Sequence, residues 1–173
     1  MSATDNPRLF DVENPDHSPN KRQFALYTDG SGHADGYGGA AVCVQDNLNL
    51  GLYRIVCSRN RTSTARMEHE ALLMGLQFVC ETIGSTTEEH RRVLITRPTV
   101  FWLSDREDLV LSVAGIYKRK HNADLWCRQS WYEHSLDIHP YYAPRATTSM
   151  NILVDELAGV GRVMCRDLKA YLD

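Results

Sequence analysis

The sequence lacks the features that would place it in a membrane or in a secreted compartment. Its apolar runs, such as residues 71–76 and 99–103, fall far short of the roughly 20 residues that a membrane span needs. The N-terminal segment has no apolar stretch typical of a secretory signal, and it is too acidic for a mitochondrial presequence. We therefore expect a cytoplasmic protein that does not bind membranes.

The sequence also lacks a disulfide framework and a strong charge of either sign. The cysteines are odd in number and form no C-x-x-C pair, so a reducing compartment fits best, and each is expected to be a small core residue: Cys43, Cys57, Cys80, Cys127 and Cys165. There are 22 acidic and 19 basic residues, which gives a net charge of −3. This balance argues against a strongly basic protein that binds nucleic acid over its whole surface, but it allows a local basic patch.

The chain has 173 residues, the length of a single domain, and its patterns predict short strands and helices. Residues 1–22 carry three prolines and no periodicity, which predicts a flexible tail before a single domain at 23–173. Alternating and helical apolar spacings predict strands at 24–28, 40–44, 50–57, 100–103 and 137–143, and helices at 66–81, 104–117, 123–134 and 149–172.

The order of these elements, β-β-β-α-β-α-α-β-α, predicts the fold class. Three antiparallel strands followed by alternating helices and strands give a mixed α/β fold, in which helices pack on a five-stranded sheet. The first and fourth strands are expected to be neighbours. A glycine-rich segment at 30–32 is expected to end the first strand, and the Ser104 to Glu107 spacing predicts a capping box.

Four acidic residues lie at the ends of predicted strands or near the starts of predicted helices. Taken singly, Asp29 could be a turn residue, Glu68 could favour a helix N-terminus, Asp105 could cap a helix, and Asp155 could lie on a solvated face. Taken together, two follow neighbouring strands and two lie near the starts of helices packed over them. Clustered carboxylates repel one another unless cations bind, and such hard oxygen ligands suit Mg²⁺ or Mn²⁺. Two such ions would support phosphodiester hydrolysis.

The motifs around these acids resemble the type 1 ribonuclease H family of the ribonuclease H-like superfamily. They occur in the family's order: Y-T-D-G-S at 27–31, G-Y-G-G at 36–39, R-M-E at 66–68, L-S-D at 103–105, N-A-D-L-W at 122–126, and Asn151 followed by D-E-L-A at 155–158. The R-M-E match selects Glu68 over Glu70.

The resemblance implies a metal-dependent endonuclease that hydrolyses the RNA strand of RNA–DNA hybrids and leaves 5′-phosphate ends. By this resemblance Asp29, Glu68, Asp105 and Asp155 are the catalytic and metal-binding residues. Asp29 would bridge two Mg²⁺ ions, Mn²⁺ would substitute for Mg²⁺, and the enzyme would act as a monomer. No protein partner is indicated.

The expected nucleic-acid contacts are hydroxyl, amide and basic side chains near these motifs: Ser31, Ser63, Thr64, Arg66, Lys118, Arg119, Lys120, Arg145 and Asn151. Arg145 stands where the family often has a loop histidine, and Thr64–Ala65 replaces an asparagine pair. Two alternatives remain open at this point. One is a binding module of the same fold with weak or no cleavage, and the other is a superfamily nuclease acting on another structured nucleic acid.

Overall fold

The computed structural model describes residues 22–47, 52–59, 61–84, 97–145 and 147–172. Residues 1–21, most of the expected tail, lie outside this range, as do residues 50 and 51 of the third expected strand. The strands are β1 (Gln23–Gly32), β2 (Gly38–Asp46), β3 (Leu52–Arg59), β4 (Thr99–Ser104) and β5 (Asp137–Tyr142), and the helices are α1 (Thr64–Gly84), α3 (Glu107–Val113), α4 (Ala123–Ser135) and α5 (Ser149–Leu172).

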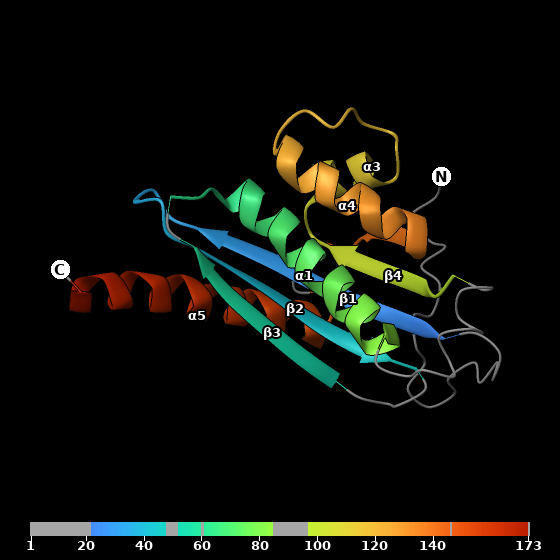
Figure 1. Cartoon of the computed structure of the whole chain (residues 1–173). Coiled ribbons are helices and arrows are strands. Elements are labelled where there is room, and N and C mark those ends of the chain that lie inside the picture. The colour runs from blue at the N-terminus through green and yellow to red at the C-terminus, as the bar shows by residue number, and fades with distance from the viewer. Residues whose placement is uncertain (1–21, 48–51, 60, 85–96, 146, 173) are drawn as a thin grey trace.

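The strands form one mixed sheet in the order β3-β2-β1-β4-β5 (Figure 1). β1 pairs antiparallel with β2 and parallel with β4, so the predicted neighbours lie side by side at the centre of the sheet. The predicted mixed α/β fold and its element order are therefore confirmed.

The helices cover both faces of the sheet, and the strand residues divide between them. α1, α3 and α4 lie on one face and α5 lies on the other (Figure 1). Phe24 and Leu26 of β1 pack with residues of α1, α3 and α4, whereas Ala25 and Tyr27 pack with residues of α5. This division follows from the two-residue alternation of side chains along a strand. Among the described residues, no helix is both long enough and apolar enough to cross a bilayer.

The glycine-rich segment continues β1, where the sequence predicted a break. Gly30 pairs with Ala40, and Gly32 pairs with Gly38. Glycine is needed at position 30 because α1 approaches the strand closely: a Cβ on Gly30 would lie 2.2 Å from the backbone nitrogen of Glu68. The absent side chain therefore allows α1 to lie directly on the strand that carries Asp29.

Two helix boundaries also differ from the prediction. α1 begins at Thr64, after a turn in which the Ser63 carbonyl accepts hydrogen bonds from the Arg66 and Met67 amides, so Glu68 lies in the second turn. The predicted capping box does not form. Ser104 Oγ accepts a hydrogen bond from the Arg106 amide, and no side chain caps α3.

α3 also ends at Val113, before the predicted end near residue 117. Gly115 follows with a φ of +76°, the left-handed conformation that commonly ends a helix. The core assignment of the cysteines was wrong for Cys127, which is exposed on α4, while Cys43 is buried in β2 as expected. All five cysteines are free thiols.

Candidate active site

Three of the four acids meet at the end of the two central strands. The parallel register pairs Tyr27 with Leu103 as the last pair, so Asp29 and Asp105 each follow this pair by two residues. Glu68 reaches the same place from α1. One carboxylate oxygen from each of the three lies within 4.8 Å of those of the other two. The structure thus brings together Asp29, Glu68 and Asp105 as a carboxylate cluster.

Two oxygens of this cluster are buried and have no hydrogen-bond partner. They are Oδ2 of Asp29 and Oε2 of Glu68, whose residues are only 5% and 4% exposed. A buried polar atom without a partner is costly, so such atoms call for a ligand. Burial, followed by the negative charges of Asp105 and Asp155, raises the pKa of Asp29 to about 6. Burial, followed by the charges of Asp29 and Asp105, raises the pKa of Glu68 well above its usual value.

Asp155 lies at the rim of the cluster, on α5, and contacts Arg145. The guanidinium donates a 2.5 Å hydrogen bond to Oδ1 of Asp155, and its Nε lies 3.8 Å from Oδ2 of Asp105. A narrow cleft is lined by Asp29, Asp105, Asp155 and Arg145 together. Arg145 therefore neutralises part of the charge of the acids at the open side of the site.

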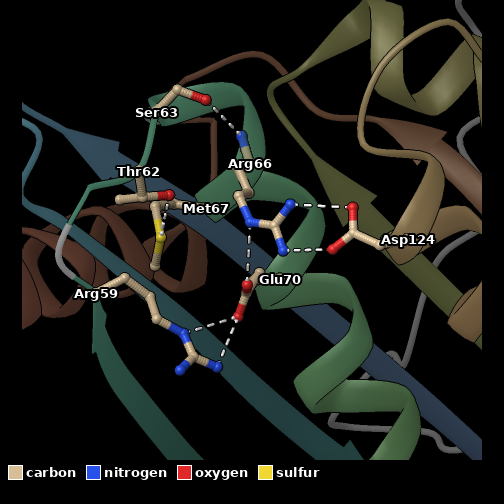
Figure 2. A network of polar contacts seen from close by, with 7 residues as sticks. All are labelled: Arg59, Thr62, Ser63, Arg66, Met67, Glu70 and Asp124. Atoms are coloured by element: carbon tan, nitrogen blue, oxygen red, sulfur yellow. Dashed lines mark hydrogen bonds and ion pairs between the residues drawn. The ribbon is translucent and has the colours of Figure 1, made fainter.

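Glu70 does not join the cluster, although it lies only two residues beyond Glu68. Its carboxylate contacts Arg59 on one side and Arg66 on the other (Figure 2). Arg66 in turn forms a bidentate pair with Asp124 at the start of α4 (Figure 2). The predicted nucleic-acid residue Arg66 thus joins α1 to α4, and its side chain remains one-third exposed.

The other expected nucleic-acid contacts are placed differently from one another. Ser63 and Thr64 are exposed at the start of α1, and Ser31 is half-buried near the end of β1. Asn151 is buried: its side-chain amide donates to the Ala143 carbonyl, and its Oδ1 accepts from the Thr148 hydroxyl. In this structure Asn151 holds the start of α5 against the end of β5.

A larger groove, of about 490 Å³, lies beside the carboxylate cluster, between α1, α3, α4 and the segment 114–122. The residues that follow Glu68 and Asp105, namely His69 and Arg106, line it. Lys118 and Lys120 line it as well, whereas Arg119 does not. Sequence reasoning missed Arg106 as a groove residue; its position directly after Asp105 was the available signal.

The comparisons with known proteins agree with this architecture. No protein-family profile and no curated protein matches the chain by sequence. Among solved structures, it is similar to the N-terminal RNase H domain of a Mycobacterium tuberculosis protein (17% identity, 85% of this chain and 98% of that chain, TM-score 0.66). It is also similar to LC11-RNase H1 in complex with an RNA/DNA hybrid (19% identity, 82% of this chain and 97% of that chain, TM-score 0.67). A third similar structure is RNase H1 of the halophilic archaeon Halobacterium salinarum (17% identity, 80% of this chain and 96% of that chain, TM-score 0.58). The chain therefore has the ribonuclease H-like fold.

Proposed function

We propose that this protein is a ribonuclease H, a divalent-metal-dependent endonuclease that hydrolyses the RNA strand of RNA–DNA hybrids. The observation that carries the proposal is the pair of buried, unpartnered oxygens of Asp29 and Glu68, which lie beside Asp105 in the carboxylate cluster. Three converging carboxylates are a donor set that Mg²⁺ and Mn²⁺ favour. These residues fit the metals, so the assignment of the cluster stands on chemistry as well as on the fold.

Asp29, Glu68 and Asp105 would hold a first ion, and Asp155 would contribute to a second one at the rim. Bound divalent ions activate a water molecule and stabilise the leaving oxygen of a phosphodiester. The protein's own contribution is rigidity. Thr28, next to Asp29, is buried and accepts a 2.8 Å hydrogen bond from the Trp102 indole of the neighbouring strand, which fixes the two central strands beside the cluster.

The groove supports the nucleic-acid part of the proposal. Of its cationic residues, Arg106 directly follows Asp105 of the carboxylate cluster, and Lys118 and Lys120 line the same groove. These side chains can contact the phosphates of one strand while another strand reaches the acids. Because Arg106 is paired with Asp108, the two lysines supply most of the unpaired positive charge in the groove. We expect the affinity for hybrid to fall with salt, and to fall less steeply when Lys118 and Lys120 are replaced by glutamine.

The proposal is tested by incubating the protein with labelled RNA–DNA hybrid, duplex RNA and duplex DNA, in Mg²⁺, in Mn²⁺ and in EDTA. We expect cleavage of the hybrid's RNA strand alone, in either metal, and its loss in EDTA and in Asp29→Asn. Asp155→Asn is compared with Glu156→Gln, which removes the same charge from the next, exposed position on α5. The first variant should lose activity, and the second should retain it.

The outcomes separate the proposal from its alternatives. Binding of hybrid without cleavage in either metal would refute the enzyme and indicate a binding module. Cleavage of duplex RNA or duplex DNA in preference to hybrid would indicate a nuclease with another substrate. Equal activity of wild type and Asp29→Asn would contradict the assignment of Asp29 to the metal site.

A further inference from the structure

The three consecutive basic residues after α3 do not face the same way. Lys118 and Lys120 line the groove, whereas Arg119 is turned toward α4. There its guanidinium donates a 2.7 Å hydrogen bond to Oε1 of Glu133 and lies over the ring of Trp126, 4.6 Å from the ring centroid. The carboxylate of Glu133 neutralises part of the charge of this guanidinium and fixes its direction, so Arg119 is less available to a phosphate than a cation that faces the groove.

The carboxylate that holds Arg119 is itself part of a chain of hydrogen bonds that ends on α1. Oε1 of Glu133 also accepts a hydrogen bond from Nε2 of Gln129, at 2.7 Å. Oε1 of the buried Gln129 then lies 2.8 Å from Nε2 of His69. Because the amide oxygen can only accept, the histidine nitrogen donates. The His69 ring also packs edge-on against Trp126, with centroids 4.3 Å apart.

From this arrangement we propose that Glu133 is a positioning residue: through Arg119 it holds the segment 114–122 in place, so that Lys118 and Lys120 face the groove. The inference rests on the proposed function in so far as the groove binds nucleic acid. It differs from the sequence-based expectation, in which Arg119 contacts the hybrid directly. Arg119 instead holds the segment 114–122 to α4 through Glu133, and the two lysines on either side of it make the phosphate contacts.

The two interpretations predict opposite effects of removing Glu133. Nucleic acid is a polyanion, so loss of a nearby negative charge normally strengthens binding or leaves it unchanged. If Arg119 were a phosphate contact, Glu133→Ala would also release it for binding. If Glu133 positions the loop, the same substitution weakens binding, because the lysines lose their fixed placement and must be ordered when the hybrid binds.

The experiment measures hybrid affinity by fluorescence anisotropy, with all variants made in an Asp29→Asn background so that the substrate is not cut. We expect Glu133→Ala and Arg119→Ala each to weaken binding by about threefold to tenfold, and the double variant to weaken it no further, because the two residues act as one unit. Glu133→Gln keeps an acceptor oxygen and should restore most of the affinity. Glu107→Ala, which removes a negative charge from an exposed position on α3, is the matched control and should not weaken binding.

Unchanged or tighter binding by Glu133→Ala would overturn the inference, as would additive effects of the two substitutions. A second measurement does not depend on nucleic acid. Amide hydrogen exchange of segment 114–122 in the free protein should become faster in Glu133→Ala and Arg119→Ala but not in Glu107→Ala. If wild-type protein failed to bind hybrid, the proposed function would fall, while the exchange data would still decide whether Glu133 holds the loop.

Discussion

Replacing Asp29 by asparagine should make the metal-free protein more stable while it abolishes metal-dependent activity. The folded protein holds this carboxylate where burial and the charges of Asp105 and Asp155 oppose its ionisation. Its pKa is raised from 3.8 to about 6, so the folded state binds this proton more tightly than the unfolded chain does. The ionised carboxylate therefore destabilises the metal-free fold at neutral pH.

The magnitude follows from the two pKa values. Their difference corresponds to a loss of roughly 3 kcal/mol in the free energy of unfolding of the metal-free protein once the pH exceeds both values. The loss is absent below about pH 4, grows as the pH rises through the interval from 3.8 to about 6, and is then constant. Asparagine is also polar and buried, so we expect Asp29→Asn to recover about 1–3 kcal/mol at pH 7.5, and less as the pH falls toward 4.

The measurement is urea denaturation of both proteins in EDTA and in Mg²⁺, at pH 7.5 and pH 4.5. Wild type should gain stability from Mg²⁺ at pH 7.5, since an ion that binds only the folded state stabilises it, and Asp29→Asn should gain far less. Glu156→Gln is the control and should match wild type throughout. A metal-free Asp29→Asn protein less stable than wild type at pH 7.5 would refute the electrostatic reasoning.

Three further predictions concern residues around the cluster. Arg145→Gln should bind Mn²⁺ about two- to fivefold more tightly in an electron paramagnetic resonance titration, because the guanidinium, 70% exposed, competes with the ion for carboxylates; weaker binding would contradict this. Gly30→Ala should lower the free energy of unfolding by about 2 kcal/mol or more, since its Cβ would meet the α1 backbone. Gly159→Ala, with open space around it on α5, should raise the free energy of unfolding by about 0.5–1 kcal/mol; urea denaturation measures both. Trp102→Phe should cost about 1–3 kcal/mol in the same assay, because the Thr28 hydroxyl loses its buried donor. Equal stability of the two glycine variants, or a neutral Trp102→Phe, would contradict the packing described here.

The sequence was informative where local chemistry and periodicity determine structure. The change from alternating to helical apolar spacing gave the element order, because a strand or a helix must present its apolar residues to a core. The same reasoning suggested that β1 and β4 are neighbours, which places Asp29 and Asp105 two residues beyond the last pair of a common register. A motif match, not a physical argument, selected Glu68 over Glu70, two residues further along the chain.

Sequence patterns misled where packing overrides local preference. Gly30 was expected to end a strand, because glycine is common in turns, but the strand continues in register with β2 through Gly32. The glycine is needed there because α1 lies too close for a side chain. The Ser104 to Glu107 spacing predicted a capping box, yet the Ser104 hydroxyl bonds the Arg106 amide and the helix starts later.

The sequence by itself determined which residues carry chemistry, because residue type sets whether a side chain can hold a cation or contact a phosphate. Only the tertiary structure decided which of these groups are free to do so. Arg119 and Lys120 are neighbours of like charge in the sequence, yet one is paired with Glu133 and the other lines the groove. Glu68 and Glu70 differ in the same way, since arginines neutralise Glu70 and an oxygen of Glu68 is left buried without a partner. Arg119 is paired because α4 brings Glu133 to the segment 114–122, and Glu70 is paired in part because β3 brings Arg59 to α1. Such contacts join separate elements and leave no local pattern in the sequence.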